Sequence, residues 1–431
     1  MFELCIFDLD ETLIHTNDLE EIRLSLANND DEGILETLLE TLEEDDERLI
    51  YSQDIIQEII ASHPDILLAI FTRSPRSYAE TVLEWAYPEI EWDMLICYED
   101  VRPTKPNGQG IKNIMEYFEI EDLTKVVMIG DADIDIKAAY NAGCVALLDQ
   151  SGWPRSYSSE HWNAINLIPD AIINEPSNLL DFLAEPHKYL PILECLLDSG
   201  NVDSKRFDRI GHFIPRSIGG DTTNFPIYVA GRNFSNYESL YYKRAEHSLT
   251  ESISSNKNST EFPCEWVNTL REFISEKCAG FFWTKTIIIT SIPHRPGRIP
   301  RLENLLSQLI TSLTDEPIQH CNVILATDLL AYRDGVRSQH GEHLNQGERF
   351  MNVRDHLITS NVSRLSSVDE VVVIDEVVVI DEVVVIDEVV VIDDVVTTGA
   401  SLIYAYKSLR DAGARSVTLF SLAKNISDVL R

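Results

Sequence analysis

The sequence is poor in positive charge. Its 431 residues include 35 lysines and arginines against 72 aspartates and glutamates, which leaves a net charge of -37 at pH 7. Proteins that bind nucleic acids or anionic membranes over a broad surface need a basic face, so the composition argues against both classes. It does not exclude phosphorylated small molecules, because enzymes also bind phosphate through Mg²⁺ and backbone N–H groups.

The sequence also lacks closely spaced cysteine pairs and long uninterrupted apolar runs. Its seven cysteines form no CxxC motif, which predicts reduced, mostly buried thiols in a cytoplasmic protein. The opening MFELCIFDLDETL has no basic segment and contains acids, which is atypical of a signal peptide. The apolar runs near the C-terminus carry an acid every few residues, so we expect no membrane-spanning segment.

Strand-like and helix-like segments alternate through both halves of the chain. Apolar segments such as DILLAIF and VVMIG end in polar loops and are followed by helical patterns. This alternation predicts an α/β protein with parallel sheets, and the length favours two domains. We place the first domain at 1–185, a linker at 186–205 and the second domain at 206–431. A Leu- and Glu-rich segment at about 16–60 is expected to form a small helical cap on the first domain.

In the first domain, polar side chains follow several apolar segments. They are Asp8, Asp10, Thr72, Lys105, Asp131 and Asp135. Ligands of open α/β sheets bind outside the carboxyl ends of the strands, so we expect these groups to converge. Phosphoryl transfer through an aspartyl phosphate needs such a set. It uses one carboxylate as nucleophile, a second as acid and base, others for Mg²⁺, and a hydroxyl and a lysine for the phosphate oxygens.

The order of these segments resembles the haloacid dehalogenase superfamily over about residues 1–150. Its DxDxT motif is matched by Asp8, Asp10 and Thr12, and its GDxxxD motif by the segment GDADID. The resemblance implies a Mg²⁺-dependent phosphohydrolase. The implied roles are Asp8 as nucleophile, Asp10 as acid and base, Thr72 and Lys105 as catalytic phosphate-binding groups, and Asp131 and Asp135 as Mg²⁺ ligands beside Asp8 and the backbone carbonyl of Asp10.

The string VVVIDDVVTTGAS at 389–401 is the strongest motif of the second domain. Its β-branched residues predict a central strand of a parallel sheet. The loop that follows, together with the N-terminus of the next helix, can bind a phosphate through backbone N–H groups, and the two acids can accept hydrogen bonds from ribose hydroxyls. The candidate ligand-binding residues are Asp393, Asp394, Thr397, Thr398, Gly399, Ala400 and Ser401.

This string resembles the phosphoribosyl pyrophosphate (PRPP) signature of type I phosphoribosyltransferases. SIPHRPGR at 291–298 resembles their pyrophosphate-side loop and adds Arg295 and Arg298, although ordinary solvated arginines explain this loop equally well. LNQGERFMNVRDHL at 344–357 is similar to the ComF-like branch. The resemblance implies a PRPP-dependent transferase of nucleotide or nucleoside metabolism. The alternative is a regulatory, stress-response or phage-defence protein in which the same fold senses a nucleotide.

Residues 369–392 are four tandem copies of DEVVVI. One copy suffices for the strand that leads into Asp393, so three are surplus and must loop out, pair with themselves or displace that strand. Because six is even, a slip by one copy keeps the same side chains facing inward. We hypothesise a length switch in which the repeat number sets transferase activity. A tolerated insertion and an interaction strand are the alternatives.

The sequence as a whole predicts two Rossmann-like parallel-sheet domains in one bifunctional enzyme. The expected ligands are Mg²⁺, phosphorylated small molecules and PRPP, with no membrane or nucleic acid as partner. The phosphatase substrate, the base acceptor and the formation of a homo-oligomer stay open.

Overall fold

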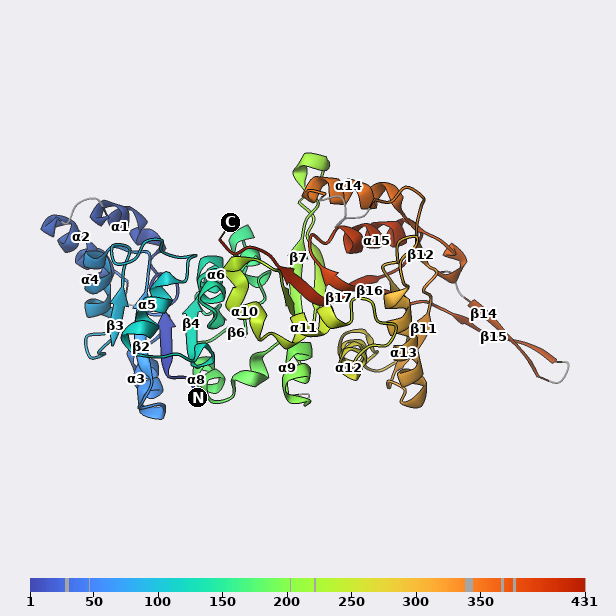
Figure 1. The fold of residues 1–431 in the computed structure, drawn as a ribbon, viewed down its shortest axis with the longest axis horizontal. Coiled ribbons are helices and arrows are strands. Elements are labelled where there is room, and N and C mark those ends of the chain that lie inside the picture. Colours follow the sequence, from blue (N-terminus) through green and yellow to red (C-terminus); the bar gives the residue numbers. More distant parts are fainter. Residues whose placement is uncertain are drawn as a thin grey trace. The chain divides into compact units, whose positions relative to one another are not determined.

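The computed structural model describes residues 1–431 except 28–30, 46, 202, 221, 338–343, 366–367, 375–376 and 431; between 368 and 384 only the backbone is described. The chain divides into two compact units (Figure 1). Unit 1 comprises Met1–Leu190, Phe234–His247 and Ile426–Arg431, and unit 2 comprises Pro191–Asn233 and Ser248–Asn425.

Unit 1 contains a six-stranded sheet in the order β3-β2-β1-β4-β5-β6, and all of its strand pairs are parallel. The strands are β1 (Leu4–Phe7), β2 (Leu67–Phe71), β3 (Met94–Ile96), β4 (Val126–Gly130), β5 (Val145–Asp149) and β6 (Ala171–Ile173). The two central strands, β1 and β4, are buried along their whole length. Cys5 and Phe7 of β1 pack into one apolar cluster and Leu4 and Ile6 into another, because successive side chains of a strand point to opposite faces.

Helices follow the strands of unit 1, as the sequence pattern predicts. They are α1 (Glu20–Leu26), α2 (Glu32–Glu43), α3 (Gln53–Ser62), α4 (Arg76–Ala86), α5 (Gln109–Tyr117), α6 (Asp133–Ala142), α7 (Ser159–Ile165), α8 (Asn178–Ala184) and α10 (Tyr241–Ala245). The segment expected to form a helical cap contains α1, α2 and most of α3. Helix α6 ends at Gly143, whose φ of 97° is the left-handed conformation that glycine adopts readily at a helix end.

Two segments from later in the chain belong to unit 1, which a single boundary at 186–205 does not anticipate. The ring of Phe234 packs edge-on against Tyr140 with ring centres 5.3 Å apart. The Lys243 ammonium lies 2.8 Å from the Asp170 carboxylate. The expected linker is also largely structured: Ile192, in α9 (Ile192–Ser199), is fully buried in the core of unit 2. These assignments depend on contacts between distant segments.

Unit 2 contains a seven-stranded sheet in the order β11-β10-β16-β17-β8-β7, with β9 paired to β17. The strands are β7 (Asp208–His212), β8 (Phe225–Val229), β9 (Arg232–Phe234), β10 (Lys285–Ser291), β11 (Cys321–Leu325), β16 (Glu388–Val396) and β17 (Val417–Ile426). The strands from β11 through β17 to β8 pair in parallel, but β7 runs antiparallel to β8. The sheet is therefore mixed and not wholly parallel as predicted, because the chain reverses direction between His212 and Phe225 and β7 pairs antiparallel with β8.

The other elements of unit 2 are helices and two small strand pairs, one of which lies in the hexad repeat. The helices besides α9 are α11 (Ser248–Ser255), α12 (Cys264–Phe273), α13 (Arg301–Asp315), α14 (Gln346–His356) and α15 (Ala400–Asp411), and β12 (Leu330–Tyr332) pairs with β13 (Leu357–Thr359). Short helical turns in the chain are η1 (Asn17–Leu19), η2 (Leu123–Lys125), η3 (Pro186–Tyr189), η4 (Arg216–Ile218), η5 (Glu238–Leu240), η6 (Ile274–Cys278) and η7 (Val362–Leu365).

The hexad repeat is divided between two sheets. Strand β16 starts in the last copy, lies between β10 and β17, and is buried from Val389 to Ile392, as predicted for a central strand. The preceding copies form β14 (Val368–Ile374) and β15 (Val377–Val384), which pair antiparallel in a separate two-stranded sheet (Figure 1). Of the three fates open to the surplus copies, the structure shows pairing with themselves.

All seven cysteines are free, and six of them are buried. Over the described parts of the chain, no helix is both long enough and apolar enough to cross a membrane.

Candidate active site

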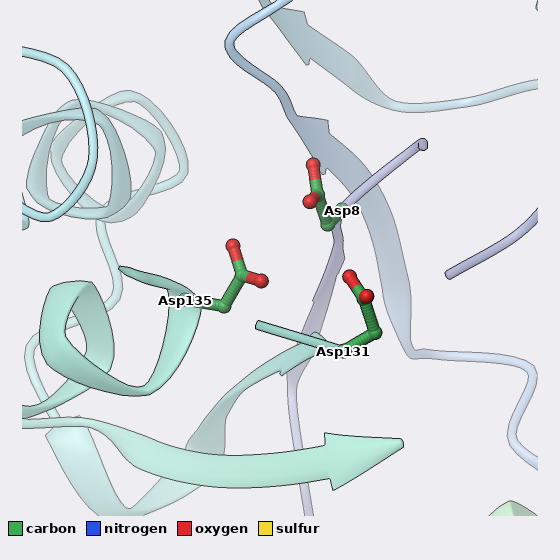
Figure 2. A group of neighbouring side chains, drawn as sticks. All are labelled: Asp8, Asp131 and Asp135. Atoms are coloured by element: carbon green, nitrogen blue, oxygen red, sulfur yellow. The ribbon is translucent and has the colours of Figure 1, made fainter. Parts of the chain in front are cut away.

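Three carboxylates converge at the carboxyl ends of β1 and β4 in unit 1. Asp8 follows β1, Asp131 follows β4, and Asp135 lies in the first turn of α6. Figure 2 shows their carboxylates directed toward one common space, and one oxygen of each lies within 4.8 Å of the others. The parallel sheet therefore brings together three of the four acids expected to bind a metal.

Lys105 lies within this cluster. Its ammonium is 2.7 Å from an oxygen of Asp8 and 2.7 Å from an oxygen of Asp135, and its side chain is fully buried. The second oxygen of Asp135 accepts a hydrogen bond from the backbone N–H of Ala132 at 3.1 Å. One ammonium against three carboxylates leaves two negative charges uncompensated when all groups are ionised.

This excess of buried negative charge appears in the pKa values of the cluster. Burial raises the pKa of Asp8 to about 7, against the opposing charge of Lys105. Burial, followed by the charges of Asp135 and Asp8, holds the pKa of Asp131 well above its usual range. Burial opposes the charge on Lys105, yet Asp135 and Asp8 raise its pKa above the usual value. A divalent cation would relieve the repulsion, and the all-oxygen ligand set suits Mg²⁺.

Asp10 is not part of the three-carboxylate cluster. Its carboxylate accepts hydrogen bonds from the hydroxyls of Thr16 at 2.8 Å, Tyr78 at 3.0 Å and Ser74 at 2.5 Å. The guanidinium of Arg23 lies 3.4 Å from the same carboxylate. Sequence reasoning missed these four neighbours. Ser74 could have been noticed two residues after Thr72, whereas Tyr78, within α4, has no comparable signal.

The two threonines of the predicted motifs lie beside the acids. The Thr72 hydroxyl is buried, accepts a hydrogen bond from the Ser74 N–H at 3.0 Å, and lies 3.5 Å from an oxygen of Asp10. The Thr12 hydroxyl accepts a hydrogen bond from the Asp131 N–H at 3.1 Å. A cavity of about 640 Å³ extends over the site, and its walls include Asp8, Asp10, Thr72 and Asp131 from the predicted set.

A second cavity, of about 220 Å³, lies in unit 2 at the end of β16. All seven residues predicted from the string at 389–401 line it, together with Arg295. Arg298 is exposed and is not among its lining residues. Gly399 adopts a φ of 75° immediately before α15, a left-handed conformation that glycine adopts readily.

Other groups around the second cavity were not predicted. Arg301 pairs with Asp394 at 2.9 Å, and the guanidinium of Arg295 lies 6.0 Å from the ring centre of Tyr332. Lys424 donates a hydrogen bond to the Thr397 carbonyl at 2.9 Å, and burial lowers the pKa of this lysine to about 8. Desolvation, with the charge of Asp394 adding to it, raises the pKa of Asp393 well above its usual range.

Residues 19–148 match the family model described as haloacid dehalogenase-like hydrolase. The match begins after Asp8 and Asp10 and includes Thr72, Lys105 and the acids of GDADID. Unit 1 therefore contains a haloacid dehalogenase-like hydrolase domain. No curated protein matches the chain.

Several solved structures are similar to part of the chain. A predicted phosphoglycolate phosphatase from Haemophilus somnus is 16% identical, with a TM-score of 0.31, over 42% of this chain and 98% of its own. The 2-haloacid dehalogenase from Pseudomonas syringae is 20% identical, with a TM-score of 0.24, over 43% of this chain and 99% of its own. The HAD-hydrolase candidate YfnB from Bacillus subtilis, solved with bound magnesium, is 17% identical, with a TM-score of 0.30, over 42% of this chain and 98% of its own.

Proposed function

We propose that unit 1 is a Mg²⁺-dependent phosphohydrolase that works through an aspartyl phosphate. The observation that carries this proposal is the position of Asp8, which lies at a strand end within one cluster with Asp131, Asp135 and the Lys105 ammonium. The haloacid dehalogenase-like match of residues 19–148 supports the same chemistry.

In the proposed reaction, the Asp8 carboxylate attacks phosphorus and the leaving group departs with a proton from Asp10. Lys105 favours the ionised, nucleophilic form of Asp8 and binds an oxygen of the transferred group, and Thr72 donates a hydrogen bond to another. Asp10 then takes a proton from the water that hydrolyses the aspartyl phosphate. Hydrogen bonds from Thr16, Ser74 and Tyr78 fix the orientation of its carboxylate.

Mg²⁺ bound by Asp8, Asp131 and Asp135, with the Asp10 backbone carbonyl, would neutralise the charge of the phosphate and the acids together. Asp135 has one oxygen beside Lys105 and the other on the Ala132 N–H, so it also positions the lysine.

Phosphate release from simple phosphate monoesters in the presence of Mg²⁺ tests the hydrolase. We expect Asp8→Asn to abolish it, because an amide cannot form the aspartyl phosphate. Asp133→Asn is the matched control, since Asp133 lies close in sequence to the cluster but pairs with Lys137 at 2.7 Å. Turnover by Asp8→Asn equal to that of the wild type would contradict the proposed nucleophile.

We propose that unit 2 binds PRPP and acts as a phosphoribosyltransferase. Support comes from the cavity at the end of β16, where the acids Asp393 and Asp394 and the loop at 397–401 line one space. The acids would bind the ribose hydroxyls and the loop the 5'-phosphate, with Arg295 beside the pyrophosphate. The exposed Arg298 has weaker support.

Calorimetric titration of the full chain with PRPP tests this second proposal. We expect Asp394→Asn to weaken binding and Asp411→Asn, at the far end of α15, to leave it unchanged. Consumption of PRPP with a base acceptor indicates a transferase, whereas saturable binding without consumption favours the regulatory, nucleotide-sensing alternative. No binding at all would overturn both.

We also propose that the repeat number controls the second site. With β14 and β15 paired to each other, the last hexad occupies β16 and leads directly into the loop. A slip by one copy would place Asp387 and Glu388 where Asp393 and Asp394 now lie and would displace the loop by six residues. Deleting 369–386 leaves one copy and removes this alternative, so we expect tighter PRPP binding. Equal affinity in both lengths would favour a tolerated insertion.

A further inference from the structure

The cavity of unit 1 is lined by arginines as well as by acids. Two arginines line it, Arg23 from α1 and Arg73 from the loop after β2. Lys105 and the proposed Mg²⁺ already compensate the charge of the carboxylate cluster. Arg23 pairs with Asp10, which lies outside that cluster, and Arg73 pairs with no acid within the described parts of the chain, although the chain as a whole has few basic residues.

Both guanidinium groups have donors available to a ligand. Arg23 keeps about a third of its side chain exposed (32%), and its contact with Asp10, at 3.4 Å, is longer than a charge-assisted hydrogen bond of about 2.7–2.9 Å. Arg73 is exposed and has no hydrogen-bonding or ionic partner within the described parts of the chain. Each could bind an anion without breaking a strong contact.

We infer that the substrate carries a second anionic group, a carboxylate or a second phosphate, which Arg23 and Arg73 bind while the transferred phosphate lies against Asp8. The inference rests on the proposed phosphohydrolase activity. The planar guanidinium matches both kinds of anion through paired hydrogen bonds.

The rest of the cavity sets the size and nature of the molecule between the two anions. A volume of about 640 Å³ accommodates a small metabolite. Leu24 and Tyr98, both well exposed, line the cavity beside the arginines and offer apolar contact to a carbon skeleton. Arg23 also contacts Asp10, so a bound second anion would compete for this guanidinium and change the surroundings of the proposed acid.

Two pairs of probe substrates test the inference, because the members of each pair differ chiefly in one anionic group. The first pair is 3-phosphoglycerate and glycerol 3-phosphate, which differ in a carboxylate. The second is fructose 1,6-bisphosphate and fructose 6-phosphate, which differ in a phosphate. Phosphate release by the full chain with Mg²⁺ gives kcat/KM for each. We expect kcat/KM to be about tenfold or more higher for the member with the second anionic group in at least one pair, which is the effect of a charge-assisted hydrogen bond. The pair that shows this preference identifies the second anion as a carboxylate or a phosphate.

The variants Arg23→Gln and Arg73→Gln should reduce that preference about tenfold, mainly through KM for Arg73→Gln. Arg155→Gln removes the same charge from an exposed position that does not line the cavity, and it should retain the preference. Equal kcat/KM within both pairs for the wild type would overturn the inference while leaving the hydrolase intact. An equal loss for both members of a pair would also overturn it, because the arginines would then act on the transferred phosphate. Absence of phosphate release from all four probes would instead refute the proposed function.

Discussion

Replacing Lys105 by methionine should destabilise unit 1 strongly in the absence of divalent metal. The ammonium lies 2.7 Å from oxygens of both Asp8 and Asp135, and the side chain has no exposure to solvent. Methionine has a similar length but no charge, so the variant leaves two buried carboxylates without their cation. Removing one partner of a buried ion pair costs about 3–5 kcal/mol, because the remaining charge is neither hydrated nor compensated.

Lys125→Met is the matched control for this substitution. The Lys125 ammonium also lies 2.7 Å from a carboxylate oxygen, that of Glu3, but both side chains are more than 40% exposed. Water solvates either charge when the partner is removed, so we expect little change in stability. Both variants replace a lysine whose ammonium lies 2.7 Å from a carboxylate oxygen, and they differ in the burial of that ion pair.

Amide hydrogen exchange of the full chain, followed by mass spectrometry, localises the effect. A loss of about 3–5 kcal/mol in the free energy of unfolding accelerates amide exchange in β1 and β4 by about two to four orders of magnitude. This holds for amides that exchange only when unit 1 unfolds. Residues 417–425 of β17, which belong to unit 2, serve as an internal reference. Protection of β1 within tenfold of the wild type, at neutral pH without metal, would refute the reasoning. An equal effect of Lys125→Met would refute the role of burial.

The stability that unit 1 loses in Lys105→Met should become smaller as the pH falls. Burial opposes the charge on Lys105, but the carboxylates of Asp135 and Asp8 outweigh it and hold the folded-state pKa of Lys105 above 10.5, so its contribution is fully present at neutral pH and is lost only at strongly alkaline pH. Burial raises the pKa of Asp8 to about 7 even with the lysine present, and removing the lysine raises it further. As the pH falls through this raised pKa, the Asp8 carboxylate of the variant therefore takes up a proton and no longer needs a cation.

Two further variants test the acid cluster and the loop of unit 2. Asp131→Asn should raise the melting temperature of the metal-free protein, because burial and neighbouring acids hold the Asp131 pKa high, and should reduce the stabilisation by Mg²⁺; an unchanged response to Mg²⁺ in thermal unfolding would contradict its role as a ligand. Gly399→Ala should cost about 1–2 kcal/mol from its positive φ of 75°, and more because the new Cβ would lie 2.9 Å from the His212 ring. Gly413→Ala, with a φ of 102° and no atom within 4 Å, isolates the backbone part, and equal losses in urea unfolding would exclude the contact with His212.

Much of the first site was predictable because parallel sheets bring strand ends to one edge. Asp8 and Asp131 each follow an apolar segment that forms a central strand, so their proximity follows from the alternation of strands and helices. The surroundings of Asp10 were not predictable. They depend on Thr16, Arg23 and Tyr78, which come from a turn and two helices whose packing no local pattern encodes.

The second unit shows the same division. The apolar hexad followed by two acids predicted a buried strand leading to an anion-binding loop, and β16 has that position in the sheet. The antiparallel pairing of β7 with β8 and the contact of Arg301 with Asp394 were not foreseen. Both arise between segments whose own sequences are compatible with several partners.

The sequence by itself determined the central strands β1, β4 and β16, that each of them leads into acids, and that the repeat contains more strand-forming segments than one sheet needs. These properties depend on side-chain periodicity and on local backbone preference. Only the tertiary structure decided that Lys105 lies between Asp8 and Asp135, that residues 234–247 belong to unit 1, and which hexad enters the large sheet. Such choices depend on the burial of charge and apolar surface between segments that are distant in the sequence. No local pattern encodes the free energy of these contacts, because it depends on which segments the fold brings together.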